Sequence, residues 1–355
     1  MKKFSTNLGI FFIVLFLTIN LSTNAQKTVF PGQHWDYVKE VSEMGYNASK
    51  LKKARKFSET IKTSAVVIVE NGLIVDEWGE VDKKYMTHSV RKSFLSAMYG
   101  QYVLDGTIDL DKRMIDIGVD DVPPLSNVEN KATIRDCLKA RSGIYHPALY
   151  ESQGMKDLKP ARHTERPGTH WYYNNWDFNA AGTIFEKFTG KKIFEALKES
   201  IADPIGMENF EIEDGEYVTG DASIHPAYPF IITAHDFARF GLLMLNRGNW
   251  DGKQVIAAEW VDESTRYHSD ATLYGSDGYG YMWWVSRKHN KFPHLPNVEL
   301  PEGTYSARGA GGHYIMIIPK YNMVVVHRVD TFVRNRVSKN DFGTLLNLIL
   351  EARNK

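Results

Sequence analysis

Apolar runs that suit β-strands lie near the two ends of this chain, and the segments between them have helical spacing. Residues 65–69 and 73–75 flank Asn71-Gly72, a dipeptide that favours a tight hairpin turn. Residues 279–285, 313–318 and 323–327 are strand-like runs in the C-terminal part. The pattern predicts an α+β fold, with an antiparallel sheet built from both chain ends, flanked by helices, and an inserted helical region.

Apolar periodicity and capping residues place the expected helices. Asn47 and Thr233 are N-cap candidates, and Gly190 is positioned to end a helix. The expected helices cover residues 34–62, 133–138 (closed by glycine), 176–188, 193–201, 234–245 and 342–352. We expect a single domain over residues 26–355, with its sheet part at about 26–87 and 228–355 and its helical part at about 88–227.

The first 25 residues have the pattern of a secretory signal peptide. Two lysines follow the initial methionine, residues 10–17 are apolar, and Thr23-Asn24-Ala25 provides a small-residue cleavage site. A membrane span needs about 20 apolar residues, and Asn20 interrupts this run. We therefore expect export to the periplasm or the medium, with no membrane span after signal cleavage.

Composition excludes several classes of function. The 43 basic residues balance the 43 acidic ones and form no basic block, so there is no electrostatic case for nucleic-acid binding. The single cysteine, Cys137, excludes an intrachain disulfide. The 12 histidines show neither His-Glu-x-x-His nor paired Cys/His spacing, so we expect no metal and no cofactor.

A serine three positions before a lysine opens the apolar run that begins near residue 88. On a helix, Ser89 and Lys92 share a face while Arg91 points elsewhere. A serine hydroxyl needs a base, and lysine can act as one only if its pKa falls from about 10.4 towards about 7. Burial against the apolar run can lower it. The same spacing recurs at Ser49 and Lys52, in a charged segment typical of a solvated helix face.

Two further motifs are weaker when taken alone. The run Tyr172-Tyr173-Asn174-Asn175 could supply a tyrosine that shuttles a proton and an asparagine that orients substrate or Lys92, or it could be packing. The run Arg308-Gly309-Ala310-Gly311-Gly312 could leave backbone N–H groups free for an oxyanion, although a hairpin turn is the local alternative. His88 and His313 flank these motifs and either line a cleft or pack.

The ordered set of motifs resembles the serine β-lactamase and penicillin-binding-protein superfamily, particularly its class C-like branch of esterases, D-amino-acid peptidases and amide hydrolases. The run from Ser89 to Lys92 is similar to the family's Ser-x-x-Lys motif. The resemblance covers roughly residues 35–350. Other family-like segments are residues 133–144, 167–190, 203–207, 234–241 and 279–284.

The resemblance implies a class C β-lactamase/transpeptidase-like fold and a division of roles. Ser89 would be the acylated nucleophile, and Lys92 and Tyr173 would share the acid/base work. The family's catalytic tyrosine lies nine positions before the glycine of the next helix, here Gly182, which selects Tyr173 and Asn175 over Tyr172 and Asn174. The oxyanion hole would use the N–H groups of Ser89 and Gly312.

The third motif departs from the family pattern. Relatives have Lys-Thr-Gly or His-Thr-Gly there, and those side chains hold a substrate carboxylate. Here the aligned residues are Gly309-Ala310-Gly311, as in esterase-like and 6-aminohexanoate-oligomer hydrolase-like members. This departure argues against penicillin-type substrates. The expected substrate- or oxyanion-binding residues are Asn175, Arg308, Gly311, Gly312 and His313.

The sequence therefore predicts an exported serine hydrolase that forms an acyl-enzyme on Ser89 and hydrolyses a small ester, amide or peptide. One alternative is a β-lactamase or a DD-peptidase or D-amino-acid peptidase. The other is a catalytically silent binding or sensor domain on the same fold. No Gly-x-Ser-x-Gly elbow surrounds any serine, which disfavours an α/β-hydrolase.

Overall fold

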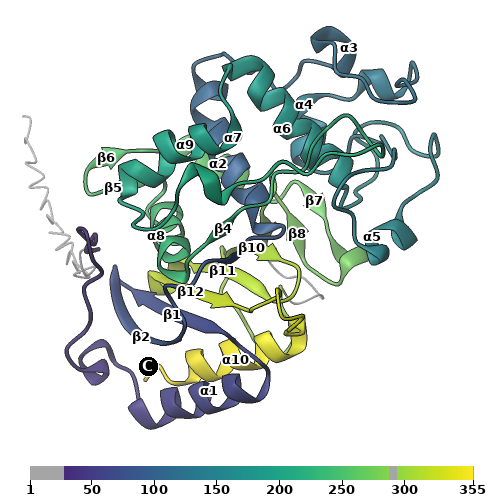
Figure 1. Cartoon of the computed structure of the whole chain (residues 1–355). Helices are drawn as coiled ribbons and strands as arrows, with labels where there is room; N and C mark the ends of the chain where they lie inside the picture. Colours follow the sequence, from purple (N-terminus) through teal and green to yellow (C-terminus); the bar gives the residue numbers. More distant parts are fainter. Residues whose placement is uncertain (1–27, 288–293, 355) are drawn as a thin grey trace, which may run out of the picture.

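An eight-stranded antiparallel sheet forms the centre of the protein (Figure 1). The computed structural model describes residues 28–287 and 294–354, so the expected signal peptide at 1–25 lies outside the described residues. The strand order is β2-β1-β12-β11-β10-β9-β8-β7. The strands are β1 (Ala65–Glu70), β2 (Leu73–Gly79), β7 (Ser269–Asp270), β8 (Gly278–Tyr279), β9 (Trp284–Val285), β10 (Tyr305–Gly309), β11 (His313–Ile318) and β12 (Met323–Arg328). Because β1 pairs with β12, the predicted sheet from both chain ends is confirmed.

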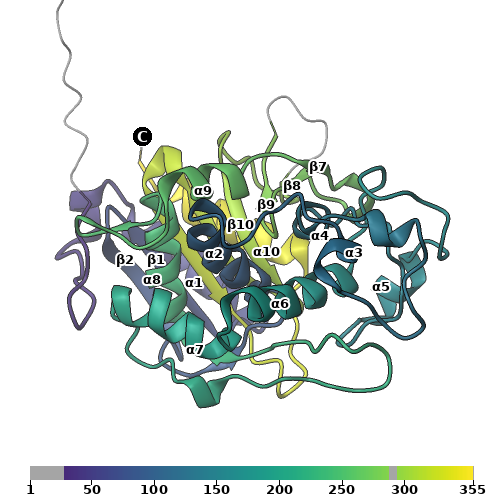
Figure 2. The same cartoon turned by 90° about the horizontal axis from the view of Figure 1, so that it is seen from above.

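Two apolar layers cover the two faces of this sheet. Along β1, Val67 and Val69 join one core cluster, whereas Val66 and Ile68 join the other, as the alternation of side chains along a strand requires. Helices α1 (Ala48–Thr60) and α10 (Lys339–Glu351) lie side by side on one face (Figure 1). Helices α2 (Val90–Leu104) and α8 (Ala234–Leu245) lie across the other face (Figure 2).

The remaining helices gather beyond α2, on the side of the sheet that α2 and α8 cover (Figure 2). They are α3 (Met114–Ile117), α4 (Ile134–Leu138), α5 (Gln153–Leu158), α6 (Asn175–Thr189), α7 (Ile193–Leu197) and α9 (Ala258–Ser264). Four short strands form two small ribbons: β3 (Tyr85–Met86) with β4 (Ile231–Ile232), and β5 (Asn249–Trp250) with β6 (Lys253–Gln254).

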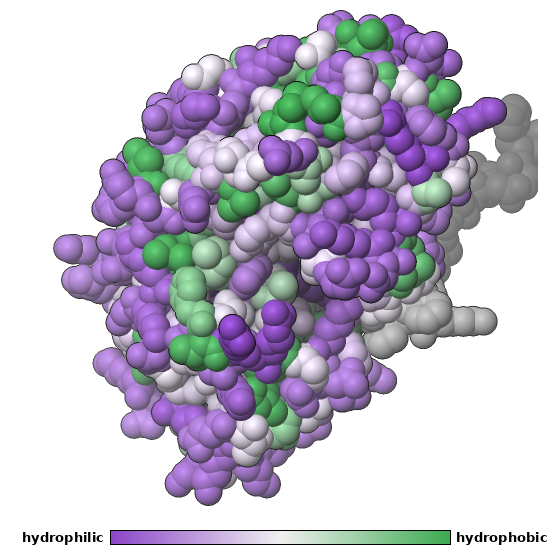
Figure 3. Space-filling model, turned by 45° about the vertical axis from the view of Figure 1, so that its right-hand side comes forward, coloured by the Kyte–Doolittle hydropathy of each residue, from purple (hydrophilic) through white to green (hydrophobic). Residues whose placement is uncertain are grey.

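One face of the molecule is hollowed near its middle, and its hydrophobic residues occur in small groups between hydrophilic ones (Figure 3). Within residues 28–287 and 294–354, no helix has the length and apolar character that crossing a bilayer requires.

Several capping predictions hold, whereas three element boundaries are wrong. Asn47 and Thr233 accept hydrogen bonds from their helices as N-caps, and Gly190 ends α6 with a left-handed φ of 67°. The expected helix over 34–62 is interrupted, because Gly45 takes a φ of 76° before α1 begins. The run 279–285 is not one strand but the hairpin β8–β9, turned at Met282, whose φ is 61°. The short helix at 133–138 ends at Leu138, with Lys139 rather than a glycine as its C-cap.

Candidate active site

Helix α2 begins at the predicted nucleophile and is held by the β8–β9 turn. Ser89 is the N-cap residue of α2, yet its side chain makes no capping hydrogen bond, so its hydroxyl stays available. Farther along the buried face, Ser93 Oγ donates to Met282 O at 2.8 Å and Ser96 Oγ donates to Tyr281 O at 2.6 Å. These two bonds fix the rotation of α2 and therefore the direction of Ser89.

Lys92 brings three of the predicted residues together. Its Nζ lies 3.1 Å from Ser89 Oγ, 2.9 Å from Tyr173 OH and 2.8 Å from Asn175 Oδ1. The same nitrogen lies over the rings of Tyr173 and Phe178, at 4.2 and 4.4 Å from their centroids. Only 1% of Lys92 is exposed. The structure therefore gathers the predicted nucleophile, base and tyrosine around one buried amine.

Burial assigns different protonation states to the two candidate acid/base groups. Desolvation, aided by the positive charge of Arg91 and opposed by Glu151, lowers the pKa of Lys92 well below its usual value. Desolvation raises the pKa of Tyr173 to about 12, although a hydrogen bond from Ser89 and the charges of Arg91 and Arg308 oppose this. Burial thus favours the neutral amine of Lys92 and the protonated hydroxyl of Tyr173.

The structure separates the two overlapping Tyr-x-Asn triplets. Tyr172 OH donates to the carbonyl of Met155 and does not contact Lys92. Asn174 is the N-cap of α6, accepting from Trp176 N, while its amide donates to Ile144 O at 2.7 Å. Tyr173 and Asn175 are therefore the pair at the site, as the spacing to Gly182 predicts.

The orientation of the Asn175 amide limits what Lys92 can do. Asn175 Nδ2 donates to Tyr150 O at 2.6 Å, and a backbone carbonyl can only accept. Asn175 Oδ1 therefore faces Lys92 and takes one of its N–H groups. A neutral lysine amine then has one more N–H and one lone pair to share between Ser89 and Tyr173, which suits proton transfer between these three groups.

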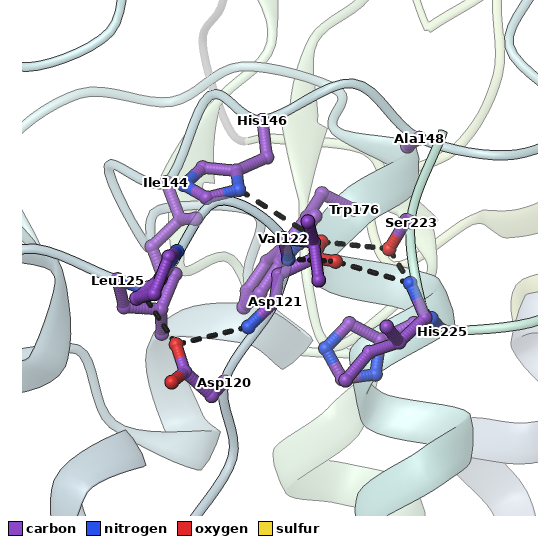
Figure 4. Close-up of polar contacts among 12 residues, drawn as sticks. Asp120, Asp121, Val122, Leu125, Ile144, His146, Ala148, Trp176, Ser223 and His225 are labelled. Carbon is purple, nitrogen blue, oxygen red and sulfur yellow. Dashed lines mark hydrogen bonds and ion pairs between the residues drawn. The ribbon is translucent and has the colours of Figure 1, made fainter. Parts of the chain in front are cut away.

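A buried polar junction holds the start of α6 behind this pair (Figure 4). Asp121 accepts from Trp176 Nε1 at 2.6 Å and from Ser223 Oγ at 2.7 Å. His146 also lies beside this carboxylate, with its Nδ1 3.8 Å from Asp121 Oδ2 and its ring centroid 6.2 Å from that of Trp176. Because Trp176 directly follows Asn175, the junction restrains the backbone that carries the lysine's acceptor.

The glycine-rich segment forms the turn between β10 and β11. Gly311 and Gly312 have φ values of 90° and 105°, which side chains rarely tolerate. A Cβ on Gly309 would lie 2.6 Å from Thr87 O, so the turn packs directly against the segment before the nucleophile. The N–H of Gly312 donates to Gly309 O at 3.3 Å. The expectation that Gly312 supplies a free oxyanion donor is therefore wrong, because the turn uses that N–H.

The outer edge of β10 offers a different donor. The N–H of Ser286 donates to Thr304 O, so the backbone N–H and C=O of Thr304 face β9. In an antiparallel strand every second residue faces the same neighbour, so the backbone N–H of Arg308 also faces the β9 side. Strand β9 pairs only with Tyr305 and Ser306, which leaves the Arg308 N–H without a strand opposite it. Helix α2 contacts β10 here. The N–H of Ser89 likewise makes no hydrogen bond with the described residues. These two N–H groups are the candidate oxyanion donors.

The side chains of Arg308 and His313 hydrogen-bond to residues other than Ser89, Lys92 and Tyr173. Arg308 donates to Ser306 Oγ, Ser276 Oγ and His294 O, and its guanidinium lies 4.9 Å from the Trp284 ring centroid. His313 is fully buried and accepts from Arg328 Nε at 3.2 Å. Burial lowers the pKa of His313 well below its usual value. Because neither side chain hydrogen-bonds to Ser89, Lys92 or Tyr173 among the described residues, their role in substrate binding stays a prediction, and the backbone of Arg308 is the part that borders the site.

Sequence reasoning missed residues that come from irregular segments. Tyr150 lies outside the helices and strands expected from the sequence, yet its carbonyl holds Asn175 and its ring lies over Arg91. Tyr274 and Trp284 pack beside Tyr173, with ring centroids at 5.8 and 5.3 Å. No local pattern marks such residues, because their placement depends on long-range packing.

Comparisons with known proteins identify a family and several relatives that this chain resembles. A profile of the β-lactamase family matches residues 52–346. A D-aminopeptidase from Brucella canis is 27% identical over 223 residues, which span 56% of this chain and 40% of the relative. An uncharacterized protein from Alkalihalophilus pseudofirmus is 21% identical over 309 residues, which span 78% of this chain and 87% of the relative.

Solved structures share the fold at low sequence identity. A putative 6-aminohexanoate-dimer hydrolase from Bacillus anthracis is 23% identical, with a TM-score of 0.62 over 84% of this chain and 80% of that one. A β-lactamase from Mycobacterium bovis is 17% identical, with a TM-score of 0.62 over 85% of this chain and 100% of that one. EstCE1, a hydrolase with promiscuous acyltransferase activity, is 14% identical, with a TM-score of 0.62 over 86% and 99%.

Proposed function

This chain belongs to the β-lactamase family of serine hydrolases, and from that premise we propose that it is an exported hydrolase that cleaves a small ester or amide through an acyl-enzyme on Ser89. The observation that carries the proposal is the buried Lys92 amine, which lies within hydrogen-bonding distance of Ser89, Tyr173 and Asn175. Export rests on the signal-like pattern of residues 1–25.

Acylation begins with proton transfer from Ser89 to the neutral amine of Lys92. The alkoxide attacks the substrate carbonyl carbon, and the carbonyl π-electrons move to oxygen. The N–H groups of Ser89 and Arg308 stabilise that oxyanion, with the added benefit of the positive end of the α2 dipole. Tyr173 gives its proton to the departing oxygen or nitrogen and regains one from the Lys92 ammonium, so the amine returns to its neutral state.

Deacylation repeats these steps with water in place of Ser89. The neutral Lys92, acting directly or through Tyr173, takes a proton from water as water attacks the ester carbon. The bond to Ser89 Oγ then breaks, and Ser89 recovers its proton. The chain's own residues thus account for every proton in the cycle.

The surroundings of Tyr173 favour a substrate with an apolar or aromatic portion. Tyr173, Tyr274 and Trp284 form neighbouring ring contacts, and Tyr150 is 37% exposed at the loop that holds Asn175. Aromatic faces bind flat or apolar groups well. This environment suits short-chain aryl esters and anilides.

The D-aminopeptidase relative makes D-amino-acid peptides the second candidate. An aminopeptidase must accommodate a free ammonium group beside the scissile bond. The charges that act on Tyr173 are those of Arg91 and Arg308, and Glu151 is already paired with Lys159 at 2.7 Å. A positively charged surrounding of this kind disfavours an ammonium group, so esters and neutral amides are preferred.

A hydrolysis screen of the purified chain tests the proposal. The panel holds p-nitrophenyl esters, an anilide, a D-amino-acid amide and a chromogenic cephalosporin. We expect turnover of an ester or amide that disappears in Ser89→Ala. Turnover that survives in Ser89→Ala, or no turnover of any compound, would contradict it, and the second result would favour the silent binding domain.

A further inference from the structure

A buried arginine beside the proposed catalytic lysine has no acidic partner among the residues that the structure describes. Arg91 is 1% exposed, and its guanidinium carbon lies 5.1 Å from the ring centroids of both Tyr150 and Tyr228. Its Nη1 donates to His88 O at 3.1 Å, while Nε and Nη2 have no partner among the described residues. Burying a cation without a counter-ion lowers the stability of the fold. A charge that is buried in this way therefore suggests a functional use for Arg91.

No nearby negative charge compensates the positive charge of Arg91 at the Lys92 amine. Arg91 directly precedes Lys92 on α2, and its charge acts on the Lys92 amine. Glu151 is the acid that acts on Lys92, but its carboxylate is already paired with Lys159 at 2.7 Å. The other facing groups are Ser89 and, from the region of α6, Tyr173 and Asn175, which carry no charge in the resting site. The local field at the Lys92 amine is therefore positive.

The groups that face Arg91 are also neutral. Burial and nearby arginines lower the pKa of His88 to about 4, and burial raises the pKa of both Tyr150 and Tyr228. Two adjacent buried positive charges repel each other strongly at low dielectric. A guanidinium does not give up its proton in this pH range, so the lysine does.

We propose that Arg91 is a positioning residue that keeps the Lys92 amine unprotonated in the resting enzyme by placing a fixed, unpaired positive charge beside it. This inference rests on the proposed function of Lys92 as the base. The two tyrosine rings hold the guanidinium in place through cation–π contacts without neutralising it. An acidic partner in their place would cancel the effect.

A structural role for Arg91 predicts a different outcome. Its bond to His88 O supports a residue with a strained φ of 47° immediately before Ser89. Loss of that bond would lower the rate equally at every pH. Loss of the charge would instead raise the pKa of Lys92 and move the acidic limb of the pH–rate profile to higher pH.

The test measures Ser89 phosphonylation by a fluorophosphonate between pH 5 and pH 10 in the full-length protein. Arg91→Gln keeps a donor for His88 O but removes the charge. We expect the acidic limb of Arg91→Gln to move up by about one pH unit, a roughly tenfold rate loss on that limb with recovery at high pH. Arg91→Met replaces Arg91→Gln if the latter does not fold.

Arg239→Met is the matched control, because Arg239 is also fully buried but bonds backbone carbonyls of Gly32, Gln33 and Ile205 away from the site. Its profile should keep the same limb. A pH-independent loss in Arg91→Gln, or an acidic limb in Arg91→Gln that does not move, would overturn the inference while leaving the proposed function standing. Absence of Ser89 labelling in the unmodified protein would refute both.

Discussion

Replacing Asn175 by aspartate tests whether Lys92 must be neutral. The substitution places a carboxylate where Oδ1 now lies, 2.8 Å from Lys92 Nζ. At that distance and an effective dielectric constant of about 20, Coulomb's law gives about 6 kcal/mol in favour of the ammonium form, or about four pKa units. Desolvation of the new carboxylate reduces this, so we expect a rise of at least about two units in the lysine pKa.

The sign of the effect follows from which form reacts. The pKa of Lys92 is lowered in the native site, which raises the fraction of reactive amine at neutral pH. In Asn175→Asp the amine stays protonated there, and the rate of Ser89 acylation at pH 7 should fall at least about 100-fold, with partial recovery at alkaline pH. The loss of the Nδ2 bond to Tyr150 O adds a smaller, pH-independent decrease.

The assay is pre-steady-state acylation by a p-nitrophenyl ester as a function of pH. Asn179→Asp is the control, because Asn179 lies one turn along the same helix and donates to Leu149 O at 3.1 Å without contacting Lys92. Its profile should shift much less than that of Asn175→Asp, because its carboxylate lies farther from Lys92. An acidic limb in Asn175→Asp that coincides with that of the unmodified protein, at a comparable rate, would refute Lys92 as the base.

Three further predictions follow from the same geometry. Tyr173→Phe should slow single-turnover acylation at least about 100-fold and Tyr172→Phe much less, since only Tyr173 contacts Lys92; the opposite ranking would exclude the proton shuttle. Burial lowers the pKa of both His88 and His327 to about 4, below the unfolded value near 6.5. Stability should therefore be lost as the pH falls from about 6.5 towards 4, by about 2 kcal/mol for each histidine at pH 5, and urea unfolding at pH 7.5 and pH 5 measures this loss; unchanged unfolding free energy would contradict it. The kcat/KM for a short-chain p-nitrophenyl ester should exceed that for a chromogenic cephalosporin by more than tenfold, because a lost charge-assisted pair is worth about 1.5–3 kcal/mol; efficient cephalosporin turnover with negligible esterase activity would reverse the assignment.

The fold could be predicted from the sequence more completely than the residues at the periphery of the site. The Asn71-Gly72 hairpin and the apolar runs of β11 and β12 specify the sheet locally, because alternation and turn chemistry act over a few residues. The family spacing from Gly182 also selects Tyr173, which lies directly before Asn174, the N-cap of the helix that holds Gly182. The roles of Ser89, Lys92 and Tyr173 in catalysis stay predictions until activity is measured.

Long-range contacts explain what the sequence could not show. Gly312 looks like a free donor in the glycine-rich run, yet the hairpin bond to Gly309 is visible only once β10 and β11 are paired. The backbone N–H of Arg308 has no strand opposite it because the pairing with β9 stops at Ser306, and only the folded structure shows where that pairing stops. Arg91 is predicted to point away from Ser89, and nothing local indicates that two distant tyrosines enclose it.

The central claim, that Ser89 is the acylated nucleophile, is tested most directly by intact mass after treatment with a fluorophosphonate. The account predicts one adduct on the unmodified protein and none on Ser89→Ala. Ser49→Ala should keep the adduct, because Ser49 and Lys52 share the same spacing on the exposed surface of α1. An adduct that persists in Ser89→Ala, with that protein folded, would contradict the account.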